Sequence, residues 1–293
     1  MHAVAANGVH KEYGDTTALA GVDLEVDAGE AFALVGPNGA GKTTFVRCLT
    51  GTEPVDSGSV ELLGGAPGEA DPQRVGLLPQ SFSPAGRLTA REVVTHYAGL
   101  YDAARDPGDA LDTVGLAPDR RDEHYENLSG GEQRRACVAA TLVNDPDVLF
   151  LDEPTGSVDP AGRRALHAAL SELVAGGTTL LLTTHDMAEA ERLADRVGLL
   201  SSGELVAVGA PSELVAAHAG GPSLLVETDA DVGEIAGFDA ESADGGVRLR
   251  GVARDDVADV VRALDESGVA FDALEWSEPG LEDAYLALTG ESE

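Results

Sequence analysis

Residues 31–43 read AFALVGPNGAGKT, and this stretch decides the fold. The apolar run 31–35 predicts a buried strand that ends at the turn residues GPNG. The next residues fit the phosphate-loop pattern G-x-x-x-x-G-K-[ST] between a strand and a helix, where glycines let backbone N–H groups close around phosphates. Lys42 would place a positive charge at the β- and γ-phosphates, and Thr43 a hydroxyl on Mg²⁺. The candidate nucleotide-binding residues here are Gly36, Pro37, Asn38, Gly39, Ala40, Gly41, Lys42, Thr43 and Thr44.

Further apolar runs alternate with helical patterns along the chain. Residues 75–78, 148–151 and 180–183 predict buried strands, whereas 132–144 and 161–175 have helical spacing. This alternation favours an α/β fold with a mainly parallel sheet. Apolar and acidic residues alternate with a period of two before Gly29, which predicts a half-buried strand. The start of the chain is therefore expected to form an antiparallel addition to the parallel core.

The length of 293 residues favours two domains. The turn-rich stretch 218–222 is a candidate linker. After it, strand-like runs at 224–227 and 247–250 accompany apolar residues at helical spacing after 257 and after 281. We expect a first domain at 1–218 and a small C-terminal α+β domain at 221–293.

The charge balance is strongly acidic. Asp and Glu number 52 against 19 Lys and Arg, for a net charge of −33. Such a surface repels phosphate backbones, so nucleic acid is not expected as a partner. Only Lys11 and Lys42 are lysines. This composition is typical of a salt-loving organism, in which salt screens the self-repulsion; the alternative is a merely acidic protein from an ordinary habitat.

Cysteine usage and hydropathy indicate the compartment. Cys48 and Cys137 lie in apolar helical patterns without a metal-ligand partner, which predicts buried thiols in a reducing environment. No run approaches 18 apolar residues, and the N-terminus lacks the pattern of a signal peptide. We expect a cytoplasmic protein that serves a membrane only through a partner.

Two further motifs carry chemistry. The strand 148–151 ends in Asp152 and Glu153; Asp152 can hold Mg²⁺, and Glu153 can polarise an attacking water. Alone this pattern is weak, because strands often end in solvated acids. The string LSGGEQ, 128–133, places Ser129 and two glycines at a helix start that can bind an anion. Its simpler interpretation is a Ser N-cap with a nearby Glu.

The phosphate loop, LSGGEQ and the run DEPT at 152–155 occur in this order, and together they resemble the nucleotide-binding subunit of an ATP-binding-cassette (ABC) transporter over residues 1–215. The resemblance implies a P-loop NTPase cassette with a helical signature subdomain at about 84–146. It implies ATP as substrate, Mg²⁺ as cofactor and an integral-membrane permease as partner.

Individual roles also follow from the resemblance. Gln80 matches the glutamine that senses the γ-phosphate and Mg²⁺ and touches the membrane subunit, and His185 matches the switch histidine. Asp159 matches the D-loop, although Val158 stands where Leu is common. Tyr13 matches the aromatic that stacks on adenine; its alternative is a packing residue. The resemblance thus implies a catalytic set of Lys42, Glu153 and His185. The implied metal ligands are Thr43, Gln80 and Asp152. The implied phosphate-binding residues of the signature string are Ser129, Gly130 and Gly131.

In this family the signature string of one subunit completes the phosphate site of another. The resemblance therefore implies a head-to-tail dimer with two ATP molecules. A homodimer is expected, although a different cassette would satisfy the same pattern.

Other classes share these motifs. DNA-maintenance ATPases place a long coiled coil between phosphate loop and signature, but only 87 positions separate Lys42 from Ser129. Translation-associated proteins carry two cassettes and a basic surface, whereas this chain has one cassette and a net charge of −33. The ending GLEDAYLALTG, 280–290, resembles the terminus of ABC-2-type export ATPases. We therefore expect an ATPase that powers export, bound to the inner face of the membrane through its permease; an importer ATPase is the alternative.

Overall fold

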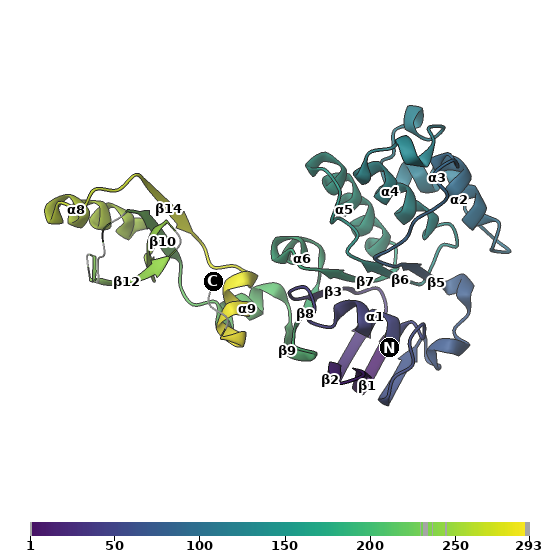
Figure 1. Cartoon of the computed structure of the whole chain (residues 1–293), viewed down its shortest axis with the longest axis horizontal. Coiled ribbons are helices and arrows are strands. Elements are labelled where there is room, and N and C mark those ends of the chain that lie inside the picture. Colours follow the sequence, from purple (N-terminus) through teal and green to yellow (C-terminus); the bar gives the residue numbers. More distant parts are fainter. Residues whose placement is uncertain (1, 229, 231–233, 236, 244, 291–293) are drawn as a thin grey trace. The chain divides into compact units, whose positions relative to one another are not determined.

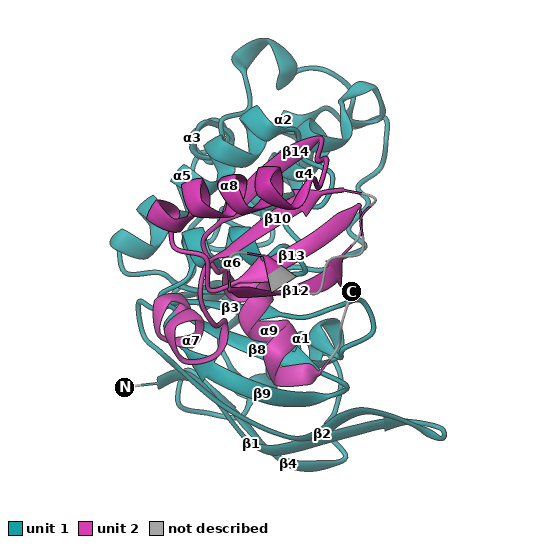
Figure 2. Ribbon diagram, turned by 90° about the vertical axis from the view of Figure 1, so that its left-hand side faces the viewer, with its two compact units in different colours: residues 1–210 teal, residues 211–293 magenta. Residues whose placement is uncertain are grey.

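A computed structural model of the chain describes residues 2–228, 230, 234–235, 237–243 and 245–290. The chain divides into two compact units, residues 1–210 and 211–293, which Figure 2 shows in different colours. The sequence places the boundary after residue 218. In the structure, α7 (Pro211–His218) belongs to the second unit because it packs against α9 (Leu281–Thr289). The stretch 218–222, which the sequence predicts to be a linker, joins α7 to the strand that follows it within the second unit.

A six-stranded sheet forms the centre of the first unit, in the order β5-β6-β7-β3-β8-β9. The first five of these strands are parallel, and β9 pairs antiparallel with β8 at the edge. Every residue of β3, β6 and β7 is buried, as expected where elements cover both faces of a parallel sheet. Figure 1 shows α1 on one side and α5 and α6 on the other. The bounds are β3 Ala31–Val35, β5 Val75–Leu78, β6 Val148–Asp152, β7 Thr179–Thr184, β8 Arg196–Ser201, β9 Glu204–Gly209, α1 Lys42–Leu49, α5 Pro160–Ala175 and α6 Met187–Leu193.

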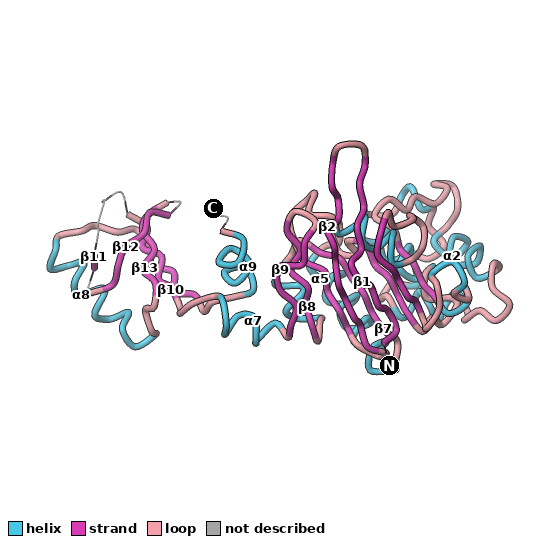
Figure 3. The backbone as a smooth tube through the Cα atoms, turned by 90° about the horizontal axis from the view of Figure 1, so that it is seen from below, coloured by secondary structure: helices cyan, strands magenta, loops and turns pink. Residues whose placement is uncertain are grey.

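A second, antiparallel sheet carries the N-terminus, in the order β2-β1-β4. It consists of β1 (His2–Tyr13), β2 (Thr16–Asp27) and β4 (Ser57–Leu62). The long strands β1 and β2 are visible side by side in Figure 3. Its apolar face and α1 share one core with the central sheet. The sequence prediction of a mainly parallel core with an antiparallel N-terminal addition is confirmed.

Three helices between β5 and β6 form the helical subdomain: α2 (Ala90–Ala98), α3 (Pro107–Thr113) and α4 (Gly130–Ala140), which pack on one another. Capping boxes start α2 at Thr89 and α4 at Ser129. The sequence predicts that the last helix runs to residue 144, but it ends at Ala140. Asn144 instead donates its side-chain amide to the carbonyls of Gln73 and Val75, which ties this turn to the start of β5.

The second unit contains an antiparallel sheet in the order β11-β12-β13-β10-β14, with α8 (Val257–Ser267) packed on one face. Its core includes Leu224, Leu249 and Leu264. The strands are β10 Ser223–Glu227, β11 Glu234–Ile235, β12 Phe238–Ala243, β13 Gly246–Arg250 and β14 Ala273–Ser277.

Short 3-10 turns occur in both units. They occupy Pro67–Glu69, Pro72–Arg74, Pro118–Arg120, Tyr125–Asn127 and Arg254–Asp256.

Both cysteines are free and buried, as predicted. Burial raises the pKa of the Cys48 thiol to about 11. Among the described residues, no helix has the length and apolar character needed to cross a membrane.

Candidate functional site

The predicted phosphate loop connects β3 to α1 and is built around glycine. Gly41 has a φ of 109°, which is the left-handed region that favours glycine. A Cβ at Gly36 would lie 2.2 Å from the carbonyl oxygen of Leu200, and a Cβ at Gly41 would lie 2.5 Å from that of Ala18. Pro37, Asn38 and Gly39 form the exposed tip. A tight loop that leads into a helix N-terminus is the geometry that binds phosphate.

Lys42 opens α1 and lies across this loop. Its ammonium group donates to the carbonyls of Gly36 at 2.6 Å and Pro37 at 3.0 Å, and it lies 3.8 Å from Oε1 of Glu153. Burial lowers the pKa of Lys42, and the charges of Glu153 and Asp152 oppose that shift. Thr43 and Thr44 follow on the same helix turn, and both are half-buried.

The two carboxylates at the end of β6 have different surroundings. Asp152 is only 2% exposed, and the hydroxyl of Thr183 donates to its Oδ1 at 2.5 Å. Glu153 has a φ of +52°, an uncommon conformation for a residue with a side chain. Its N–H donates to the Thr183 carbonyl at 3.2 Å and to the Thr183 hydroxyl at 3.1 Å. This left-handed turn lets the two side chains take separate positions.

His185 follows β7, and its Nδ1 lies 2.9 Å from Oε2 of Glu153. The structure therefore brings Lys42, Glu153 and His185 together, with the glutamate between the other two. The strands β3, β7 and β6 are neighbours. Their carboxyl ends meet at one edge of the sheet, where ligands of α/β folds bind.

A cavity of about 460 Å³ lies beside this trio. Asn38, Gln80 and Gly130 line it together with Glu153 and His185. The residues predicted to hold Mg²⁺ offer a hydroxyl, a side-chain amide and a carboxylate, which is the oxygen-rich donor set that this ion prefers. They are Thr43, Gln80 and Asp152.

The signature string and the D-loop show capping contacts within one chain. Ser129 caps α4: its hydroxyl accepts from the N–H of Glu132 at 3.3 Å, and its own N–H donates to Glu132 Oε2 at 2.8 Å. A hydrogen bond from Arg120 lowers the pKa of Glu132 to about 2. Asp159 caps α5 through the N–H groups of residues 161 and 162. A Cβ at Gly131 would lie 3.2 Å from Val158 and Asp159, so the two segments touch.

Tyr13 ends β1 and is 44% exposed. Lys11 lies 5.4 Å from the ring centroid and forms ion pairs with Glu53 at 2.9 Å and Asp56 at 3.2 Å. The partner strand β2 carries the Ala18 carbonyl that faces Gly41 of the phosphate loop. The exposure of Tyr13 speaks against a packing role, and stacking on adenine stays a prediction.

Two residues at the site were not predicted from the sequence. Thr183 is the donor to Asp152, but in the sequence it is an ordinary β-branched residue of a buried strand. Arg134 donates to the carbonyls of Asp152 and Glu153. The acceptors of Arg134 are backbone atoms, so no side-chain motif could have indicated them.

Comparison with known proteins is consistent with this geometry. Residues 19–156 match the ABC transporter family. The chain is 36% identical over 307 residues to a daunorubicin resistance ATP-binding protein of Streptomyces coeruleorubidus, covering 99% of this chain and 96% of that protein. It is 41% identical over 229 residues to Nod factor export ATP-binding protein I of Paraburkholderia xenovorans, covering 74% of each.

Solved structures agree. The dimeric structure of a bacterial ABC transporter cassette aligns with a TM-score of 0.65 and 26% identity, covering 71% of this chain and 98% of that one. A dimeric cassette bound to ADP and Pi in a post-hydrolysis state has the same fold, with a TM-score of 0.64. Because the similarity to the daunorubicin resistance protein runs through nearly the whole of both chains, this chain belongs to the ATP-binding subunits of ABC transporters, a family of ATPases.

Proposed function

We propose that this chain binds ATP with Mg²⁺ and hydrolyses it to drive export through a separate membrane permease. The arrangement of Lys42, Glu153 and His185 at three adjacent strand ends is the observation that carries the proposal. The backbone amides of the phosphate loop and Lys42 hold the phosphates. Bound Mg²⁺ would neutralise phosphate charge, held by Thr43, Gln80 and Asp152.

Glu153 serves as the base in this proposal. One carboxylate oxygen lies 3.8 Å from the Lys42 ammonium group, and the other lies 2.9 Å from the His185 ring. The side chain is thereby oriented and mostly shielded from solvent. It polarises the attacking water and accepts its proton, while His185, which is more exposed, can donate to the γ-phosphate.

The direction of transport follows from the relatives, which are named for daunorubicin resistance and for Nod factor export. We propose export for this chain, while its cargo depends on the permease. The proposed ATP-handling residues lie between Tyr13 and His185, so the second unit has an accessory role.

We also propose that two copies form a head-to-tail dimer. In one chain, the hydroxyl of Ser129 and the carboxylate of Asp159 are engaged in helix capping. The N-terminus of α4 nevertheless retains its helix dipole, which can face the phosphates of a second copy. The similarity to a dimeric bacterial cassette supports this assembly.

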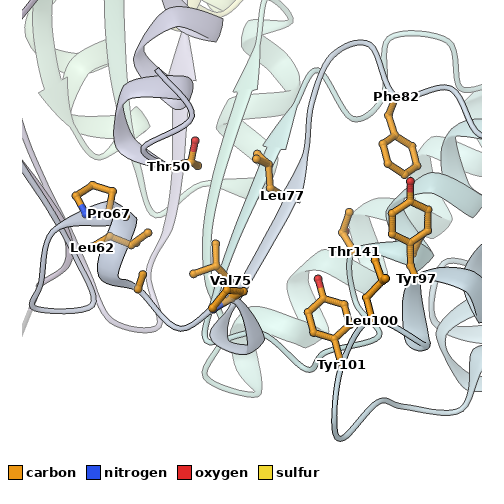
Figure 4. A pocket seen from close by; sticks show the side chains of 14 residues that line it. Thr50, Leu62, Pro67, Val75, Leu77, Phe82, Tyr97, Leu100, Tyr101 and Thr141 are labelled. Carbon is orange, nitrogen blue, oxygen red and sulfur yellow. The ribbon is translucent and has the colours of Figure 1, made fainter. Parts of the chain in front are cut away.

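A groove beside the catalytic cavity suits the permease. It has a volume of about 380 Å³ and is lined by apolar and aromatic side chains that include Leu77, Phe82, Tyr97 and Leu100 (Figure 4). Leu100 is 65% exposed. Phe82 lines both this groove and the catalytic cavity, so it connects them physically. We propose that an apolar segment of the permease docks here, which would hold the chain at the inner face of the membrane.

Glu153→Gln tests the function, because it keeps the shape of the side chain and removes its charge. ATP should still bind, but hydrolysis should fall at least ~100-fold, the range of a lost general base. Size-exclusion chromatography should then show an ATP-dependent dimer. Near-normal phosphate release by the variant would assign the base to another residue.

A further inference from the structure

We propose that Arg134 is a positioning residue for hydrolysis: its guanidinium group, carried by the signature helix, holds the backbone that presents Glu153. The proposal rests on the function proposed above for Glu153. It assigns to α4 a role within its own chain, in addition to the contact with a second copy.

The contacts of Arg134 all lead to backbone carbonyls. Its Nη2 donates to the carbonyl of Glu153 at 2.9 Å and to that of Asp152, and its Nη1 donates to that of Pro79 at 3.4 Å. The side chain is half-buried and lines the catalytic cavity. Burial lowers the pKa of Arg134, and the nearby charge of Asp152 is among the influences that oppose this shift. A half-buried guanidinium group whose hydrogen bonds go to carbonyls fixes the backbone, unlike an exposed surface ion pair.

The backbone that it fixes is unusual. Glu153 has a left-handed φ of +52°, which costs free energy for a residue with a side chain and persists only where the surroundings hold it. Thr183 holds the N–H of Glu153 from one side. Arg134 holds its carbonyl from the other side. Without this second anchor, Glu153 can relax toward an ordinary conformation, and its carboxylate then moves away from Lys42 and His185.

The same guanidinium group also links three predicted motifs. Arg134 is on the helix that Ser129 begins, Pro79 immediately precedes Gln80, and Glu153 is the proposed base. A displacement of α4 relative to the central sheet would therefore act directly on the proposed base. Because Arg134 has no carboxylate among these acceptors, its effect is on geometry.

The test compares Arg134→Gln and Arg134→Lys with the wild type in steady-state ATP hydrolysis. Arg134→Gln should lower kcat about 10- to 100-fold, the scale expected when a reacting group is displaced by about 1 Å, and leave KM for ATP within about twofold. Arg134→Lys keeps the charge but cannot span three carbonyls, so its kcat should lie between those of the wild type and Arg134→Gln. Arg91→Gln is the matched control, because Arg91 on α2 forms an exposed ion pair with Asp122; it should leave both constants unchanged.

Each outcome decides the matter. Unchanged kcat in folded Arg134→Gln, or a rise in KM that matches the loss in kcat, overturns the proposal. Thermal melting monitors folding, and if both Arg134 variants fail to fold, the residue is purely structural and the proposal is again overturned. If the wild type itself does not hydrolyse ATP, the proposed function fails instead, and this separates the two claims.

Discussion

Thr183→Val removes one hydroxyl from the most enclosed part of the site. Thr183 is fully buried, and its hydroxyl donates to Asp152, which is 2% exposed. Valine has nearly the same shape but cannot donate, so the buried carboxylate loses this hydrogen bond. The N–H of Glu153 keeps the Thr183 carbonyl as its acceptor and is not left unpaired.

The magnitude follows from the charge of the acceptor. A hydrogen bond to a charged group contributes about 1.5–3 kcal/mol to the free energy of unfolding. For a unit of this size, Tm shifts by about 2–4 °C per kcal/mol, so Thr183→Val should lower Tm by about 3–12 °C. Because Asp152 is a proposed Mg²⁺ ligand, we also expect kcat to fall about 10-fold or more.

Thr179→Val on the same strand is the matched control. Thr179 is equally buried, but its hydroxyl accepts from the neutral N–H of Gly29 at 3.0 Å. Its loss should lower the free energy of unfolding by about 0.5–1.5 kcal/mol and leave kcat unchanged. Thermal melting and phosphate release should be measured for both variants in the same salt. Equal changes in Tm and kcat for the two would refute the argument that the Asp152 contact is special.

Three other perturbations have defined outcomes. Lys42→Ala should weaken ATP binding by the isolated subunit, whereas Ser129→Arg should leave that binding nearly intact but block ATP-dependent dimerisation and turnover; equal loss of ATP affinity in both would contradict the two-chain site. Leu100→Asp should abolish stimulation of the ATPase by the permease, while the basal ATPase rate stays constant. The control is Val208→Asp at an exposed apolar position on β9, which should change neither the stimulation nor the basal rate. The net charge of −33 is screened over ~10 Å at about 0.1 M salt but over ~3 Å at about 1 M, so Tm should rise by many degrees between about 0.1 M and about 2 M KCl. A flat salt profile would mean that the acidity is not an adaptation to salt.

The strands of the central sheet are predictable because each is a short apolar run closed by turn residues. The strands β3 and β5 have the predicted bounds, and β6 and β7 differ only at their ends. The C-terminus of α4 is not predictable, since helical spacing continues in the sequence while Asn144 bonds to the distant Gln73 and Val75. The unit boundary is missed for a related reason. The contact between α7 and α9 joins residues far apart in the chain.

The candidate site divides in the same way. Side chains that belong to motifs are predictable, and the structure brings Lys42, Glu153 and His185 together as expected. The left-handed backbone of Glu153 and its anchor at Arg134 depend on carbonyl positions, which no residue pattern encodes.

Both lysines of this chain are enclosed, each with 6% exposure. The other seventeen basic side chains are arginines, whose guanidinium groups keep their charge to a pH of about 12. A surface rich in lysine loses positive charge as the pH rises through about 10. The two enclosed lysines are the only ammonium side chains in this sequence. A hydrogen bond to Glu53 raises the pKa of Lys11, and burial lowers the pKa of Lys42. At alkaline pH the positive charge of the arginine side chains therefore stays constant up to about pH 12.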